Sequence, residues 1–223
     1  MRWPPACIGR QCGVTLLVTM LILVAVMLVG ASAARMALQG EQAARAGRDR
    51  QVAFQAAEDA LMDGEREVAR TVAGEAAAGG AGTGGSADTG ASGGIGSARS
   101  ALFGGEMGIG FVDGCGTGPV NVGLCGRAGG GAAPVWQAVD LSGAEDGGGH
   151  TVQFGDFSGA AMQTGSGFLP FRRPRYLIER LPCHQPGDEV GAPGGACYRV
   201  TAIGFGARPQ MEVVLQSVYR KAD

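Results

Sequence analysis

Residues 14–34 read VTLLVTMLILVAVMLVGASAA, and this run contains no charged side chain. An α-helix rises about 1.5 Å per residue, so the run is long enough to cross the ~30 Å hydrocarbon core of a bilayer. Secretory signal peptides have a shorter apolar core of about 7–15 residues. The buried helix of a soluble protein rarely extends this far without polar side chains. We therefore predict a transmembrane helix at residues 14–34.

The flanking charges predict the direction of insertion. Residues 1–13 contain Arg2 and Arg10 and no acidic side chain. Short basic flanks stay on the cytoplasmic side of a membrane. The chain after Arg35 then lies outside the cytoplasm. We expect a single-pass protein of the bacterial inner membrane with its C-terminal domain in the periplasm.

Residues 35–77 are predicted to continue the helix beyond the membrane. They lack proline and are rich in alanine, glutamate, arginine and glutamine, which favour helices. Because an apolar stripe at helical spacing needs a surface to pack on, we expect this helix to lie on the C-terminal domain. The stripe consists of Ala53, Phe54, Ala57, Ala60, Leu61, Val68 and Val72, and the expected polar side consists of Gln55, Asp59, Asp63, Arg66 and Arg70.

Residues 78–105 are predicted to be a glycine-rich linker. The chain has 42 glycines, and residues 76–96 contain almost no apolar side chain larger than alanine. Such a composition is typical of flexible connections. A phosphate-binding glycine loop is the alternative, but no Gly-Lys-Ser/Thr sequence follows it. The linker interpretation is therefore preferred.

Residues 106–223 are predicted to form a β-rich head domain. Alternation of apolar and polar side chains over residues 211–220 is typical of a half-buried strand. Gly204, Gly206 and Pro209 supply turn residues before it, so the last two strands should form a hairpin. An antiparallel sheet with the amphipathic helix on one face would give an α+β fold. The expected strands are Ile109–Val112, Val135–Leu141, Thr151–Phe157, Tyr176–Leu181, Cys197–Phe205 and Met211–Arg220.

The cysteines agree with this topology. Cys7 and Cys12 precede the membrane segment and should stay reduced, whereas an even number of cysteines follows it, in an oxidising compartment. Four cysteines allow three pairings, and short loops favour Cys115–Cys125 and Cys183–Cys197. Each such bridge is worth about 2.5–3 kcal/mol in the chain-entropy model. Zinc binding is the alternative, but neither pair has the close spacing of zinc ligands.

Catalytic or ligand-binding chemistry is hard to find in the sequence. The formal net charge of −2 predicts no binding to nucleic acid, and both histidines, His150 and His184, lie in glycine- or proline-rich segments. Trp136 is interpreted as an anchor of the core or of an edge strand. We expect no enzyme activity, no cofactor and no metal site. Calcium binding remains an alternative, because carboxylates in glycine-rich turns could provide oxygen ligands, although the sequence has no EF-hand spacing. The acidic residues concerned are Asp113, Asp140, Glu145, Asp146 and Asp156.

The order of these segments resembles that of type IV pilins. A basic leader ending in glycine precedes the apolar helix, and residues 50–61, RQVAFQAAEDAL, are similar to the "RxxAFQAAExAL" run of PilX-type minor pilins. Residues 174–181, 198–206 and 214–220, which read PRYLIERL, YRVTAIGFG and VLQSVYR, resemble the terminal strands of that family. The resemblance covers roughly residues 10–70 and 174–220.

The resemblance implies how the chain is processed. A prepilin peptidase would cut between Gly13 and Val14, and the new N-terminus would be methylated. Most pilins carry glutamate at the fifth mature position, which is Val18 here. Its absence favours a subunit at the fibre tip or in an initiating complex over the major subunit.

The function implied is that of a minor pilin that helps to initiate or decorate a type IV pilus through helix packing. Phe54, Ala57, Leu61 and Val68 would be the packing positions, with Phe54 facing a neighbouring subunit and the later ones facing strand residues such as Val213 and Leu215. The expected partners are other minor pilins, the major pilin, a PilY-type tip adhesin, the prepilin peptidase and the membrane. The alternatives are a minor pseudopilin of type II secretion and an unrelated bitopic protein with a ligand-binding periplasmic domain.

Overall fold

The computed structural model describes residues 14–78, 98–103, 108–143, 149–183 and 195–220, with the side chains of the first helix described as far as Arg70. The chain divides into two compact units, residues 1–48 and residues 49–223. The leader residues 1–13, including Gly13, lie outside the described residues, as do Glu145, Asp146 and His184.

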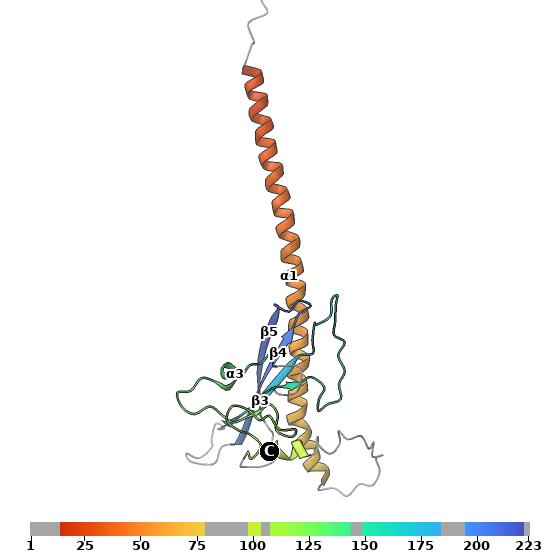
Figure 1. Ribbon diagram of the computed structural model, residues 1–223, viewed down its shortest axis with the longest axis vertical. Coiled ribbons are helices and arrows are strands. Elements are labelled where there is room, and N and C mark those ends of the chain that lie inside the picture. Colours follow the sequence, from red (N-terminus) through yellow and green to blue (C-terminus); the bar gives the residue numbers. More distant parts are fainter. Residues whose placement is uncertain (1–13, 79–97, 104–107, 144–148, 184–194, 221–223) are drawn as a thin grey trace, which may run out of the picture. The chain divides into compact units, whose positions relative to one another are not determined.

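Helix α1 extends from Val14 to Ala78 (Figure 1). It begins at the residue where the apolar run begins, and its length reflects the absence of proline throughout. It is long and apolar enough near the N-terminus to cross a membrane. Every residue from 14 to 48, the part of α1 in the first unit, is exposed.

The second unit contains a sheet with strand order β1-β3-β4-β5, in which β2 also pairs with β3. The long strands β3, β4 and β5 are antiparallel neighbours, and β1 is parallel to β3. The α+β pilin-like fold predicted from the sequence is therefore confirmed. The strands are β1 (Leu124–Cys125), β2 (Val152–Gln153), β3 (Arg175–Cys183), β4 (Gly195–Phe205) and β5 (Glu212–Arg220).

The residues of α1 from Asp49 onward pack across one face of this sheet (Figure 1). The approach is close because the contacting residues are small. A Cβ atom added at Gly204 of β4 would collide with the backbone of Ala53 and Ala57, and one at Gly64 would lie 2.7 Å from Val200. The core between helix and sheet consists of Ala60, Val68, Phe103, Leu124, Val152, Phe154, Tyr176, Ile178, Tyr198, Val200 and Ala202.

A second, smaller cluster consists of Cys115, Cys125, Val135 and Leu177. Leu177 lies on β3 between Tyr176 and Ile178, which belong to the first core, so the small cluster packs on the opposite face of the sheet. The head therefore has apolar packing on both faces of its central strands.

The three long strands confirm the sequence predictions, but two other strand predictions were wrong. Residues 109–110 form a turn, and only Val112 makes a bridge, to Cys125. The segment predicted as a strand at 135–141 begins instead with a short helix, α3 (Val135–Ala138), with Trp136 half-buried on it. Pro134 caps α3 with φ −54°, which the proline ring favours.

The strand predicted at 151–157 is shorter than expected, because β2 covers only Val152 and Gln153. Gly155 follows with φ +88°, a backbone conformation that favours glycine, and it turns the chain out of the sheet. Residues 98–103 lie within the predicted linker of residues 78–105. They nevertheless form a helix, and its Arg99 and Phe103 are buried. This end of the predicted linker belongs to the folded head.

Candidate functional site

In the described part of the chain, α1 of the first unit has a long exposed apolar surface, which is a candidate functional surface. Leu28 and Val29 are 65% and 70% exposed, and nothing lies near the position of a Cβ on Gly30. The hydroxyls of Thr19 and Ser32 donate to the carbonyls of Leu16 and Leu28, at 2.9 and 2.8 Å. These two hydroxyls are thus satisfied within the helix, which suits an apolar environment.

Of the two residues that flank the predicted cleavage site, the structure describes only Val14. Val14 is the first residue of α1, whereas Gly13 lies outside the described residues. The first turn of α1 contains no acidic side chain, and Val18 is 45% exposed. No carboxylate is therefore available at the fifth helical position.

In the second unit, α1 has a buried face and an exposed face. Of the four predicted packing positions, Ala57 and Val68 are completely buried and Leu61 is partly buried against the main core, whereas Phe54 is 37% exposed. Val72 lies beyond the described side chains. The exposed face consists of Arg50, Gln51, Phe54, Gln55, Glu58, Asp59, Met62, Arg66 and Arg70.

Asp63 was expected on the polar side of α1, and this prediction was wrong. Its side chain is only 2% exposed, and its Oδ2 accepts a hydrogen bond from the backbone N–H of Gly155 at 3.0 Å. Since the turn after β2 supplies this donor, the carboxylate can face the head despite its charge.

Asp49 attaches the β4–β5 hairpin to α1, a role that sequence reasoning missed. Its Oδ1 accepts hydrogen bonds from the backbone N–H groups of Ala207 and Arg208 at 2.5 and 3.3 Å. The guanidinium of Arg208 lies 3.8 Å from Oδ2. Asp49 is 6% exposed, so these are contacts of a buried carboxylate.

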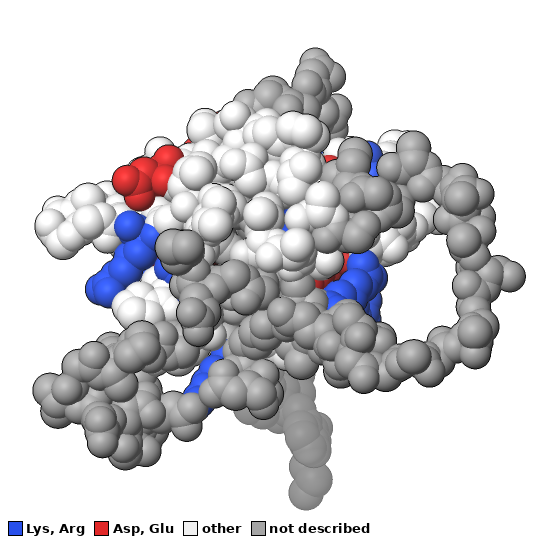
Figure 2. Space-filling model, turned by 90° about the horizontal axis from the view of Figure 1, so that it is seen from below, with Lys and Arg blue, Asp and Glu red and all other residues white. Residues whose placement is uncertain are grey.

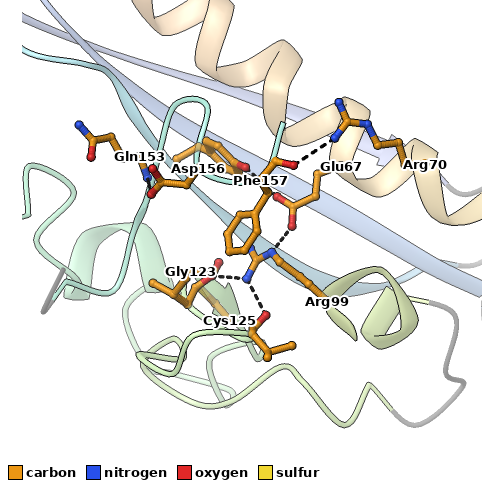
Figure 3. Close-up of polar contacts among 11 residues, drawn as sticks. Glu67, Arg70, Arg99, Gly123, Cys125, Gln153, Asp156 and Phe157 are labelled. Carbon is orange, nitrogen blue, oxygen red and sulfur yellow. Dashed lines mark hydrogen bonds and ion pairs between the residues drawn. The ribbon is translucent and has the colours of Figure 1, made fainter. Parts of the chain in front are cut away.

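A third buried carboxylate of α1, Glu67, also binds this helix to the head (Figure 3). It forms an ion pair with Arg99, and its Oε2 accepts a hydrogen bond from the Tyr176 hydroxyl at 2.7 Å. Burial raises the pKa of Tyr176, and the Glu67 charge raises it further, so this hydroxyl stays protonated and donates.

Arg99 extends this network into the loop before β1. Its Nη1 donates to the carbonyls of Val120 and Val122 at 2.9 and 2.7 Å, and its guanidinium lies 4.1 Å from the centre of the Phe157 ring. Five segments distant in sequence therefore meet around one buried charge pair (Figure 3). Asp49, Asp63 and Glu67 are thus polar residues of α1 with structural roles, and the helical pattern of the sequence did not predict their burial.

The cysteines form two disulfides, Cys115–Cys125 and Cys183–Cys197. This is the pairing that short loops favoured. The first bridge lies in the smaller core cluster, next to β1, and the second joins the ends of β3 and β4. Both disulfides cross-link residues of the head.

The acidic turns considered for calcium do not converge in the described part of the chain. Asp140 accepts hydrogen bonds from the hydroxyl and N–H of Ser142, which lower its pKa. Burial raises the pKa of Asp156, whose Oδ2 accepts from the N–H of Gln153. Among the described residues, no three His, Cys, Asp or Glu side chains are grouped to hold a metal ion.

Charged groups of both signs are interspersed among neutral ones on the face of the molecule in Figure 2. His150, the histidine within the described ranges, has its Nδ1 3.1 Å from the carbonyl of Cys115 and so contributes to the loop around the first disulfide. The surfaces that stand out are those of α1.

Comparison with protein families gives two matches in the order found in the chain. Residues 13–61 match the model described as PilX N-terminal, and residues 121–221 match the model described as Type IV pilus assembly protein PilX C-term. No curated protein and no solved structure matched significantly. The first match covers the apolar half of α1 and the start of the head, and the second covers all strands of the sheet. Since the two models together span more than half of its length, the chain belongs to the PilX family of type IV pilus assembly proteins.

Proposed function

We propose that this protein is a minor pilin, which helps to initiate or decorate a type IV pilus by packing α1 against the helices of other pilins. One observation carries the proposal: from Val14 to Leu38 the apolar side chains of α1 have no partners within the described part of the chain. Burying such side chains stabilises by about 1.5–3 kcal/mol each, so this surface demands lipid or protein neighbours. The small residues at 30–34 allow close approach of a second helix.

The proposed route begins in the inner membrane, with the head in the periplasm. Cleavage by the prepilin peptidase between Gly13 and Val14 would leave the described helix, Val14–Ala78, intact. Methylation would then modify the amine of Val14. The processed chain would leave the bilayer as its helix exchanges lipid for neighbouring pilin helices.

The absence of an acidic side chain from the first turn of α1 supports a position at the fibre tip or in an initiating complex. A carboxylate at Val18 would pair with the N-terminal amine of a neighbouring subunit. Without it, this chain lacks one of the attractions by which a subunit could be added repeatedly along a fibre. Other minor pilins, the major pilin and a PilY-type adhesin are the proposed partners.

The exposed face of α1 in the head would provide a second contact. Phe54 and Met62 are 37% and 46% exposed and lie eight residues apart on this face, beside the exposed acids Glu58 and Asp59. Completely buried Ala57 and Val68, with partly buried Leu61, would instead hold the helix on its own sheet. The proposed work of the protein is assembly, without catalysis and without a cofactor.

The proposal can be tested by purifying the tagged chain from solubilised inner membranes and identifying its N-terminus and its partners by mass spectrometry. We expect a chain that starts at Val14 and is accompanied by type IV pilins. The matched variant Gly13→Leu should accumulate as the uncut precursor. Recovery of type II secretion pseudopilins alone would assign the chain to that machine, and an uncut chain without pilins would refute an assembly role.

A further inference from the structure

Strand β5 forms one end of the sheet, and its outer edge carries the inference. In the described part of the chain no other strand pairs with this edge, and β4 is the strand on its inner side. β5 is nine residues long and contains neither proline nor glycine. Long edge strands of this kind present unpaired N–H and C=O groups and readily accept another strand.

The register shows which residues face outward. The N–H of Gly206 donates to the carbonyl of Met211 at 2.8 Å, so these two residues form a hydrogen-bonded pair at the start of the β4–β5 ladder. In an antiparallel ladder, hydrogen-bonded and non-bonded pairs alternate. The non-bonded residues, which turn their N–H and C=O groups to the outer edge, are therefore Glu212, Val214, Gln216, Val218 and Arg220.

These same residues carry the exposed side chains of β5. Burial alternates along the strand, and Val214 and Val218 are 44% and 63% exposed. Glu212 lies 3.8 Å from Arg172 but keeps 42% of its side chain exposed, so it can meet a second cation. The edge thus combines backbone groups that no described strand pairs with and an accessible row of side chains.

This row is complementary to itself when reversed. In an antiparallel pair of β5 strands centred on Gln216, Glu212 of each strand lies opposite Arg220 of the other. Val214 then lies opposite Val218, and Gln216 lies opposite its own copy. A shift of two residues in either direction places a charged side chain opposite a valine, so one register matches every pair.

We propose that β5 is a homophilic docking edge, which joins two copies of this chain through an antiparallel β5–β5 pair with its twofold axis at Gln216. Such an isologous pair satisfies the outward backbone groups of both strands. The two ion pairs at its ends select the register, and the two valine pairs lose water together.

The direction of α1 determines how the copies approach. Along α1, Asp49 lies beside Gly206, Ala53 and Ala57 lie beside Gly204, and Gly64 lies beside Val200. Over this stretch α1 therefore runs against β4 and in the same direction as β5. In the proposed pair, residues 49–64 of the two copies therefore run in opposite directions. This contact is separate from the α1 packing proposed above, and either can fail without the other.

The test uses the full chain in detergent, with self-association measured by analytical ultracentrifugation. Glu212→Arg places like charges at both ends of the pair, as does Arg220→Glu, and each should weaken association about tenfold or more. An equimolar mixture of the two variants restores both ion pairs and should associate as well as the unchanged chain. Since the variants share α1 with the unchanged chain, association through that helix would not follow this pattern. A monomeric unchanged chain, single variants of normal affinity, or a mixture without rescue would each overturn the proposal.

Cross-linking checks the register. Gln216→Cys is placed in a chain whose Cys7 and Cys12 are replaced by serine, and the matched control is Gln55→Cys on the exposed face of α1. Because opposite Cα atoms of a hydrogen-bonded pair lie about 5.5 Å apart, a short bismaleimide should join two Gln216→Cys chains efficiently. The control should stay uncoupled under the same conditions. Equal coupling at both positions, or none at position 216, would contradict a β5–β5 pair.

Discussion

Helix α1 is one continuous helix with two contrasting parts. From Val14 to Arg48 every residue is exposed, including the apolar ones, whereas from Asp49 to Arg70 a face of small and acidic residues is buried against the head. Both parts are rich in alanine and contain glycine. Composition therefore does not distinguish the two parts. They differ because only the second part has a surface within the chain to pack on.

The glycines illustrate this difference. Nothing lies within 4 Å of a Cβ placed on Gly40 or Gly47, whereas a Cβ on Gly64 would be 2.7 Å from Val200. In the first part of α1 the glycines lie on an open surface. In the second part a glycine permits close contact between helix and sheet. The helix is exposed in its first part, where we propose that it packs on other pilins, and it is a structural element of the head in its second.

The largest effect is expected where an acid replaces a buried apolar residue of α1. Val68→Asp removes a completely buried side chain and places a carboxylate in the core, which should lower the free energy of unfolding of the head by about 4 kcal/mol or more. The matched change Met62→Asp, at a residue 46% exposed, should cost less than about 0.5 kcal/mol. Chemical unfolding of the full chain in detergent measures both.

Phe54→Ala extends this comparison to assembly. We expect it to leave the unfolding of the head nearly unchanged and to reduce piliation, because Phe54 would contact a neighbouring subunit. Unfolding as severe as that of Val68→Asp would show that Phe54 is part of the core of its own chain.

Two of the ion pairs of α1, one buried and one exposed, should differ nearly as much in their contribution to stability. Arg99→Met leaves the buried Glu67 carboxylate without its cation and should destabilise the head by about 3–5 kcal/mol. The double change Glu67→Met with Arg99→Met should recover much of this loss. Arg45→Met breaks the exposed pair with Glu41 and should cost a few tenths of a kcal/mol. Similar losses of stability for Arg99→Met and Arg45→Met would show that burial does not determine how much these ion pairs contribute to stability.

Adding a single methyl group tests the close helix–sheet contact. Gly204→Ala should destabilise the head by about 1–3 kcal/mol, since the backbone of α1 must move away. Gly47→Ala should instead stabilise the helix by about 0.5–1 kcal/mol, because the site is open and alanine favours helices. Unfolding of the head and helix content by circular dichroism measure the two effects. A neutral Gly204→Ala would mean that the contact is looser than described.

The smallest effect concerns pH. Burial raises the pKa of Glu179 above its ordinary value of 4.5, although the Arg199 guanidinium opposes this. A raised pKa in the folded state favours folding while the group is protonated, and this contribution is lost as pH rises through the folded pKa. Glu179→Gln should therefore gain stability relative to the unchanged chain between about pH 4 and pH 7. Denaturant unfolding of both chains at the two pH values measures this gain. If the stability of Glu179→Gln relative to the unchanged chain stays constant or falls as pH rises, the pKa of Glu179 is not raised in the folded state.

Several elements were predictable because their signals are local. The uninterrupted apolar run predicted the part of α1 that could cross a membrane, and alternation predicted β5 and its hairpin with β4. The wrong strand predictions had apolar residues of the right kind, but Pro134 began a helix at Val135, and a turn occupied residues 109–110.

The roles of Asp49, Asp63 and Glu67 were beyond such reasoning. Each is an acidic residue on an amphipathic helix, where a solvent-exposed position is the ordinary expectation. Their partners are backbone N–H groups and an arginine that lie 32 to 159 residues further along the chain. No local pattern contains that information.

The sequence by itself thus determined that this protein has an apolar helix able to cross a membrane and a terminal antiparallel hairpin, and its short loops favoured, among three possible pairings, the two disulfides that the structure shows. These depend on the helical or strand period and on loop length, which neighbouring residues specify. Only the tertiary structure decided which face of α1 is buried, which charges lie inside the head, and that β5 is left at the edge of the sheet. Those properties depend on contacts between segments distant in sequence, because burial is created by the surface that arrives from elsewhere in the chain.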